Sequence, residues 1–128
     1  AQDYSPVTAA CMMTKKSVFE EAGGFSEELA VAFNDIDYCM KVRALGKLVV
    51  YNPYAVLYHY ESKSRGLEDT PEKVARFNRE ISIFAKKWPE ILEKGDPYYY
   101  PNLTLRKSNF ALRDLQKEAI GEPYRLEV

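Results

Sequence analysis

The sequence predicts an α/β fold with short strands, flanking helices and one long amphipathic helix in the C-terminal half. Three observations predict it. Two runs of β-branched and aromatic residues, 48–51 and 55–60, have the length of short strands. Two helix-like stretches, 17–22 and 35–45, are each followed by glycine. A longer stretch, 71–88, carries its apolar residues at spacings of three and four.

The first expected helix begins with a capping box. Ser17 is followed three residues later by Glu20, and this pair is typical of a helix N-terminus. Gly23 and Gly24 would end the helix, because glycine readily adopts the left-handed conformation that follows a helix. The small and apolar residues 7–13, which precede it, predict a buried extended segment.

The second expected helix is apolar on most of its sides. Asn34 or Asp35 can cap it, and Gly46 stops it. Asp37 and Lys41, four residues apart, form its one obvious polar pair. The apolar members are Ile36, Tyr38, Cys39, Met40, Val42 and Leu45. A helix with this composition is expected to pack against other elements on both sides.

The long helix has clear boundaries. Thr70 is expected to cap it and Pro71 to occupy its first position, where a missing N–H costs nothing. Pro89 ends or kinks it. Its apolar stripe is made by Val74, Phe77, Ile81, Phe84 and Trp88.

The C-terminal stretch is rich in tyrosine and charge. A turn at 95–97 leads into an aromatic arm, expected to be extended, over 98–105. Residues 106–128 are expected to be a loosely held tail, with a weak helical pattern at Leu112, Leu115 and Ile120. The ten tyrosines of the chain either pack at core edges and in strand pairs, or form a platform on which sugar rings stack.

Composition limits the classes of function. The chain has 128 residues, enough for one domain or part of one, and its net charge of -1 disfavours a general nucleic-acid surface. No apolar run approaches the roughly 20 residues that span a bilayer. Cys11 and Cys39 lie in apolar contexts, so both are expected to be reduced core residues rather than a disulfide or a metal site. Reduced cysteines indicate a cytosolic setting.

The triplet Asp35-Ile36-Asp37 has the form Asp-x-Asp, which suggests a metal clamp. Helical geometry argues against that, since residues two apart on a helix point about 200° apart. We therefore expect Asp35 to act alone at the start of a helix, where the helix dipole stabilises an anion. Such a carboxylate could accept a proton from a hydroxyl, or it could simply be an N-cap.

Two further features could bind ligands. His59 is the one histidine of the chain and is expected at the end of a strand; it is either structural or an imidazole ligand of a divalent cation whose carboxylates come from elsewhere. The stretch 62–66 interleaves Ser62 and Ser64 with Lys63 and Arg65 before a glycine. These groups suit diphosphate oxygens, but an ordinary basic surface loop has the same composition.

Taken together, these segments resemble the C-terminal portion of inverting family 2 glycosyltransferases, which have the GT-A (Rossmann-like) fold. The resemblance covers roughly residues 5 to 110. It is carried by Ala9-Ala10-Cys11-Met12-Met13, Gly23-Gly24-Phe25, Asn34-Asp35-Ile36-Asp37-Tyr38-Cys39, Tyr51-Asn52-Pro53-Tyr54-Ala55, His59-Tyr60-Glu61-Ser62-Lys63-Ser64-Arg65-Gly66, Gly95-Asp96-Pro97-Tyr98-Tyr99 and Asn102-Leu103-Thr104.

The resemblance implies roles for individual residues. Asp35 matches the catalytic base that deprotonates the acceptor hydroxyl, with inversion at the anomeric carbon. Asn34 stands where many relatives have Glu. Asn34 and Asp37 are both expected to contact the substrate. His59 matches a histidine that completes a Mn²⁺ or Mg²⁺ site. Lys63, Ser64 and Arg65 match a loop that closes over the diphosphate of a nucleotide-sugar donor and excludes water.

The resemblance also implies that a donor-binding half precedes this sequence. Residues 1–128 are therefore expected to be a truncated, acceptor-side part of a catalytic domain, inactive alone and prone to dimerise through exposed sheet edges. The expected enzyme acts in cell-surface polysaccharide synthesis on a saccharide or lipid-linked saccharide acceptor, in the cytoplasm or at the inner face of the membrane. The alternative is a non-catalytic carbohydrate-binding or protein-interaction module.

Overall fold

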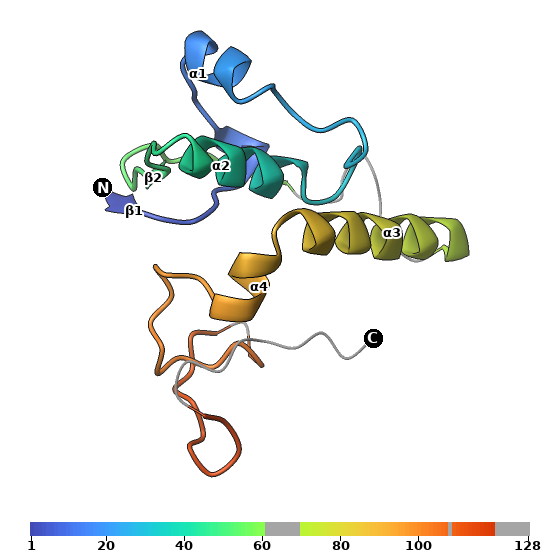
Figure 1. Cartoon of the computed structure of the whole chain (residues 1–128). Coiled ribbons are helices and arrows are strands. Elements are labelled where there is room, and N and C mark those ends of the chain that lie inside the picture. Colours follow the sequence, from blue (N-terminus) through green and yellow to red (C-terminus); the bar gives the residue numbers. More distant parts are fainter. Residues whose placement is uncertain (61–69, 108, 120–128) are drawn as a thin grey trace. The chain divides into compact units, whose positions relative to one another are not determined.

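The chain divides into two compact units. The computed structural model describes residues 1–60, 70–107 and 109–119. Unit 1 comprises Ala1–Lys86 and unit 2 comprises Lys87–Val128. Unit 1 contains short strands and helices, which confirms the mixed helix and strand composition that the sequence predicts (Figure 1). Across the described part of the chain, every helix is too short or too polar to cross a membrane.

The sheet of unit 1 consists of two short strands. β1 (Gln2–Asp3) pairs antiparallel with β2 (Val50–Tyr51), and the N–H of Tyr4 extends the ladder by donating to the carbonyl of Val49 at 2.9 Å. The expected strand at 48–51 is thus confirmed for its last two residues. The expected strand at 55–60 is wrong, because these residues are irregular and exposed.

The segment before the first α-helix differs from expectation. Residues 7–13 were predicted to be extended and buried, yet they contain the 3₁₀ turn η1 (Ala9–Cys11), which Thr8 caps. Cys11 is exposed there, so its predicted place in the core is wrong, whereas Cys39 is buried as predicted. Both thiols are free, and the prediction that they form no disulfide is confirmed.

Helix α1 (Lys16–Glu21) ends as its glycines predict. The N–H of Gly24 donates to the carbonyl of Phe19 and that of Gly23 to Glu20, the two bonds of a Schellman motif. Both glycines have positive φ, 76° and 65°. The start of α1 differs from the prediction. Lys15 is the N-cap and makes no side-chain cap bond, while Ser17 lies inside the helix. The predicted capping box is therefore wrong.

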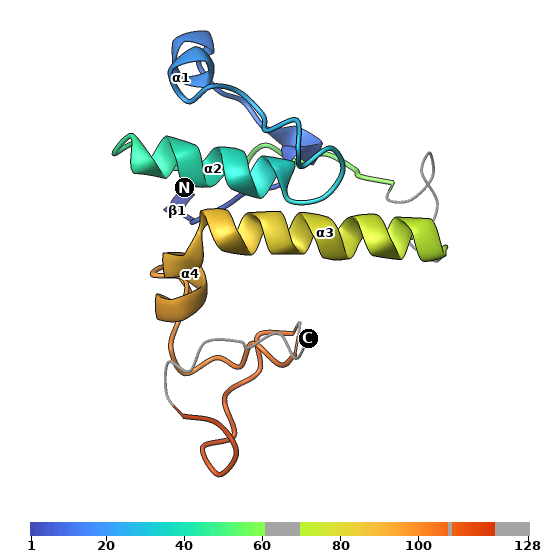
Figure 2. The same cartoon turned by 45° about the vertical axis from the view of Figure 1, so that its right-hand side comes forward.

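Helix α2 (Asn34–Ala44) is the centre of unit 1. Its N-cap is Phe33, in the left-handed conformation, so neither Asn34 nor Asp35 is the cap. Gly46 ends it in a second Schellman motif. Its buried residues are Asp37, Tyr38, Cys39, Met40 and Val42. Figures 1 and 2 both show α2 between α1 and α3.

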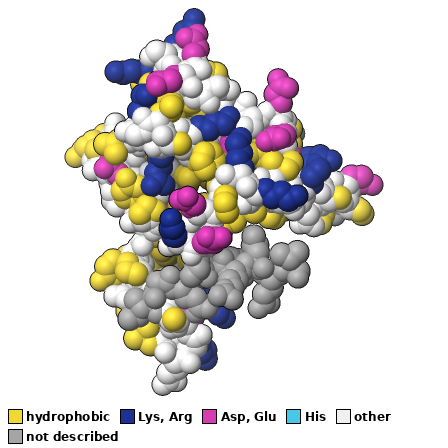
Figure 3. Space-filling model, viewed as in Figure 1, with side chains coloured by type: hydrophobic (Ala, Val, Ile, Leu, Met, Phe, Trp, Pro, Cys, Tyr) yellow, Lys and Arg dark blue, Asp and Glu magenta, His cyan; other side chains and the backbone are white. Residues whose placement is uncertain are grey.

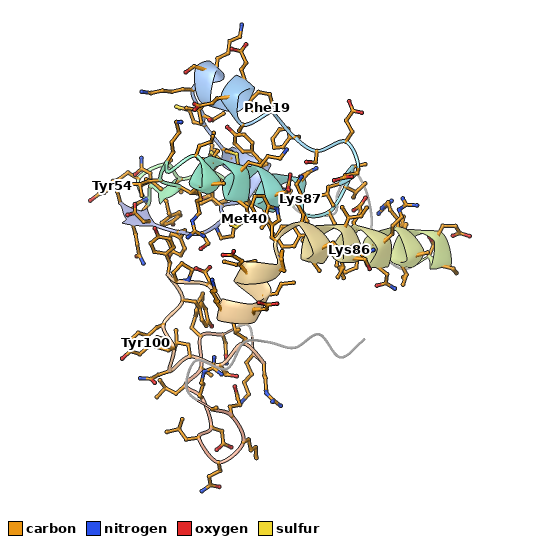
Figure 4. All side chains as sticks on the ribbon, viewed as in Figure 1. Phe19, Met40, Tyr54, Lys86, Lys87 and Tyr100 are labelled. Carbon is orange, nitrogen blue, oxygen red and sulfur yellow. The ribbon has the colours of Figure 1, made fainter. Side chains whose placement is uncertain are left out.

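Aromatic rings fill the space between α1 and α2. Phe19, Phe25 and Tyr38 form a triangle with ring centroids 5.4 to 5.5 Å apart. Figure 4 shows Phe19 reaching from α1 toward α2. Offset or edge-to-face pairs at this separation add to the stabilisation from burial.

Helix α3 (Pro71–Lys87) begins as predicted. Pro71 is its first residue, and Thr70 Oγ1 accepts from the N–H of Lys73 at 3.4 Å, the bond of an N-cap. Two members of its apolar stripe, Phe77 and Phe84, hold the ring of Phe33 between them, with centroids 5.5 Å away in each case.

In unit 2, Pro89 starts a new helix. α4 (Pro89–Lys94) has Trp88 as its N-cap and is followed by Gly95 at φ 77°. The turn predicted at 95–97 lies slightly later in the chain, at 96–99, where the N–H of Tyr99 donates to the carbonyl of Asp96 at 3.1 Å.

The expected extended arm at 98–105 is wrong. The chain turns back on itself, and Leu103 forms an isolated antiparallel bridge with Leu112. A buried polar network supports this turn: Thr104 Oγ1 donates to Glu118 at 2.8 Å, and Arg113 lies 3.4 Å from the same carboxylate. The helical pattern of the tail is not realised in residues 109–119, which form turns and this bridge.

Candidate functional site

Asp35 lies in the first turn of α2, half-buried, with both carboxylate oxygens fixed by backbone donors. Oδ2 accepts from the N–H of Ala9 in η1, and Oδ1 accepts from the N–H of Ile36, both at 2.9 Å. The second bond satisfies one of the N–H groups that a helix start leaves without an intrahelical partner. Each carboxylate oxygen has two lone pairs, so Asp35 can still accept a hydrogen bond from a ligand hydroxyl.

Asp37, two residues further, has a different task. Its side chain is 0% exposed; Oδ2 accepts from Ser26 Oγ at 2.7 Å and lies 3.3 Å from Lys41 Nζ. The predicted pair of Asp37 and Lys41 is confirmed. The two acids therefore bind different partners: Asp35 accepts from backbone N–H groups, and Asp37 from side chains. Substrate contact by Asp37 stays a prediction, and it would require these buried bonds to open.

The turn that leads into α2 is held by α3. The carboxylate of Glu80, 1% exposed, accepts from the N–H of Ala32 at 2.7 Å, and Phe33 packs on the same helix. Sequence reasoning missed Glu80, although a signal existed: it is an acid three residues after Phe77 and four before Phe84, within the apolar stripe. Buried acids of this kind need a specific partner. Asn34 follows this turn directly and is half-buried.

The thiol of Cys39 lies close to this helix start. Burial raises the pKa of Cys39, a backbone hydrogen bond with Val7 acts in the opposite direction, and the negative charge of Asp35 raises the pKa further. The thiol is therefore kept neutral and is a poor nucleophile.

His59 is exposed in the irregular stretch that follows β2, so the strand expected to carry it is absent there. Among residues 1–60, 70–107 and 109–119, no group of three His, Cys, Asp or Glu side chains could hold a metal ion. Lys63, Ser64 and Arg65 lie outside the described residues, so the expected diphosphate loop stays a prediction.

Tyrosines near the end of β2 are strongly exposed. Tyr54, Tyr58 and Tyr60 are 89%, 87% and 72% exposed, so their predicted packing at core edges is not realised. Figure 3 shows hydrophobic side chains on the surface of unit 1, and Figure 4 shows Tyr54 at its outer edge. Exposed aromatic rings are available to stack on a ligand or to be covered by a partner.

The chain is similar to several known proteins, which include an O-antigen biosynthesis protein and a rhamnosyltransferase. It is 53% identical over 112 residues, 87% of this chain, to the uncharacterized protein y4gI of Sinorhizobium fredii. It is 35% identical over 88% of its length to the O-antigen biosynthesis protein RfbC of Myxococcus xanthus. An N-acetylglucosaminyl-diphospho-decaprenol L-rhamnosyltransferase of Mycobacterium tuberculosis is 28% identical over 78 residues, 61% of this chain and 25% of that protein.

The chain spans only 12% and 8% of the length of the first two relatives. No protein-family model matches the chain, and no solved structure shows a significant match.

Proposed function

We propose that this chain is part of a glycosyltransferase that transfers a sugar from a nucleotide-sugar donor to an acceptor hydroxyl in polysaccharide biosynthesis. The observation that carries the proposal is the 35% identity to the O-antigen biosynthesis protein over 88% of the chain. The weaker similarity to a rhamnosyltransferase points the same way. A GT-A fold of the inverting family 2 type belongs to the same proposal, and it rests on the motif order in the sequence.

In the proposed mechanism Asp35 is the general base. It takes the proton of the acceptor hydroxyl while the hydroxyl oxygen forms a bond to the anomeric carbon. The bond from that carbon to the diphosphate oxygen breaks, and the nucleoside diphosphate leaves with the bonding electrons. The N–H groups of Ala9 and Ile36 support this role, because they fix the carboxylate in one orientation.

The donor and cofactor contacts extend beyond the described residues. Lys63, Ser64 and Arg65 are proposed to bind the diphosphate, and Asn34 to contact the acceptor. A Mn²⁺ or Mg²⁺ ion held in part by His59 is proposed as well. The described residues do not form a cation site by themselves, so no step is assigned to the ion. Loss of activity in EDTA, reversed by added Mn²⁺ or Mg²⁺, tests it.

The test of the mechanism is Asp35→Asn in the full-length protein, assayed by nucleoside diphosphate release from a panel of UDP-, GDP- and dTDP-sugars. The acceptor probe is N-acetylglucosaminyl-diphospho-polyprenol. Loss of a general base lowers rates by about 10²- to 10⁴-fold, and we expect kcat to fall by that amount. Glu20→Gln removes the same charge from an exposed site on α1 and is the control. An Asp35→Asn protein that keeps the control's activity would exclude Asp35 as the base.

A non-catalytic carbohydrate-binding module is the second candidate, favoured by the exposure of Tyr54, Tyr58 and Tyr60. It predicts saccharide binding without diphosphate release from any donor, and loss of that binding when the three tyrosines are replaced by Ala. Diphosphate release that depends on Asp35 would reject it.

A further inference from the structure

Three contacts from one face of α3 converge on the turn that precedes α2. Glu80 accepts the N–H of Ala32 at 2.7 Å. One helical turn to either side, Phe77 and Phe84 hold the ring of Phe33 at 5.5 Å. Figure 2 shows α3 passing below the N-terminal part of α2, where these contacts lie.

Phe33 has an unusual backbone conformation, which explains why the turn needs support. Its φ of 64° and ψ of 2° lie in the left-handed region, where a bulky side chain is disfavoured. A residue persists in that region only when its surroundings fix it. The carbonyl of Phe33 accepts the N–H of Asp37 at 2.8 Å, so the position of this residue sets the start of the helical hydrogen bonding.

Glu80 is placed where a carboxylate is costly, since it is 1% exposed within an apolar face. The 2.7 Å bond from the N–H of Ala32 gives this buried oxygen the specific partner that a buried polar group needs. An apolar residue at this position would fill the same space without that desolvation cost. The placement therefore indicates a task beyond packing.

We propose that Glu80 is a positioning residue for Asp35. By holding the N–H of Ala32, it fixes the left-handed turn at Phe33 and thereby the first turn of α2, on which the carboxylate of Asp35 stands. Glu80 acts through the backbone and not on the substrate. The inference rests on the proposed function, because the positioning has catalytic value only if Asp35 is the base.

The experiment compares Glu80→Met with Glu80→Gln in the full-length protein. Methionine preserves volume but removes the acceptor, whereas glutamine keeps an oxygen that can accept the N–H of Ala32. Glu72→Met, at an exposed position in the first turn of α3, controls for loss of a carboxylate from this helix. Amide hydrogen exchange over residues 32–37 and steady-state kinetics with the donor panel are the two measurements.

For Glu80→Met we expect exchange over 32–37 to accelerate by about 5- to 150-fold, the effect of leaving a buried donor unsatisfied. We expect kcat to fall by about 10- to 100-fold with little change in KM for the donor, because a small displacement of a reacting group affects the chemical step. Glu80→Gln should restore both quantities to within a few-fold of wild type, and Glu72→Met should change neither.

Unchanged exchange in Glu80→Met would overturn the proposal, as would acceleration spread evenly over unit 1. Local acceleration with an unaltered kcat would also overturn it. If Asp35→Asn stays fully active, the proposed base is wrong, and the exchange data still decide whether Glu80 fixes the turn.

Discussion

Replacing Asp37 by Ala is expected to destabilise unit 1 strongly. Its carboxylate is wholly buried, accepts a hydrogen bond from Ser26 Oγ at 2.7 Å and pairs with Lys41 Nζ at 3.3 Å. Truncation removes the charge that both partners face. It also leaves the Ser26 hydroxyl without this acceptor in a part-buried position.

The expected magnitude follows from these contacts. A hydrogen bond to a charged group contributes about 1.5–3 kcal/mol. The ion pair adds less, because the side chain of Lys41 is 17% exposed and its Nζ also donates to the carbonyl of Gly24 at 2.9 Å. Breaking a buried pair by removing one partner typically costs about 3–5 kcal/mol, and the partial solvation of Lys41 puts our expectation near 3 kcal/mol.

The assay is urea unfolding followed at fixed temperature, with the midpoint and slope compared between variants. Glu20→Ala is the matched control, since Glu20 and Lys16 form an i,i+4 pair at 3.7 Å whose side chains are 63% and 87% exposed. Exposed pairs of this kind contribute below about 0.5 kcal/mol. A loss of less than about 1 kcal/mol for Asp37→Ala, or a loss equal to the control, would refute the reasoning.

The remaining predictions concern the cysteines and the first glycine cap. In the native protein, iodoacetamide is expected to modify the exposed Cys11 and to spare Cys39, whose pKa is raised by burial. Rapid labelling of both cysteines would contradict the burial of Cys39. Because the unfolded Cys39 thiol ionises first as pH rises, the stability that this residue contributes is lost as the pH climbs from its ordinary pKa to its folded pKa. Gly24→Ala is expected to destabilise more than Gly23→Ala by thermal unfolding. Both have positive φ and cost about 1 kcal/mol in strain, but only at Gly24 would a Cβ meet the Phe19 ring, at 3.1 Å. Equal losses would show that the ring yields freely.

Helix ends with local chemical signals were predictable from the sequence. The glycines after α1 and α2 adopt positive φ and close Schellman motifs, and Thr70 with Pro71 starts α3. These features depend on a few neighbouring residues, so they require no knowledge of the tertiary structure. N-caps set by tertiary contacts were missed, since Phe33 occupies its cap position through contacts with α3.

Strands were less predictable because a strand needs a partner. The stretch 55–60 has the apolar and aromatic composition of a strand, yet no neighbouring strand pairs with it in the described part of the chain. The short ladder of unit 1 instead joins β1 to β2, which lie nearly 50 residues apart and have no local turn to indicate their pairing. Propensity for β structure expresses fit to neighbouring strands more than an intrinsic backbone preference.

The roles of the three acids of the site were also hard to predict from the sequence. Asp35, Asp37 and Glu80 carry the same functional group, and the sequence gives no direct sign that one has backbone donors, one a buried cation and one a distant N–H. Helical periodicity separates Asp35 from Asp37, because residues two apart face different surroundings. Burial distinguishes Glu80 from the other two acids, because a carboxylate buried within an apolar stripe needs a specific hydrogen-bond partner.

These three environments assign different consequences to the same chemical change. Loss of charge at Asp37 is expected to cost stability, at Asp35 to cost catalysis, and at Glu80 to cost little as long as an oxygen remains to accept the N–H of Ala32. The last distinction is the sharpest, because a purely electrostatic role for Glu80 would make Gln as damaging as Met. The order of kcat among wild type, Glu80→Gln and Glu80→Met therefore separates a role in geometry from a role in charge.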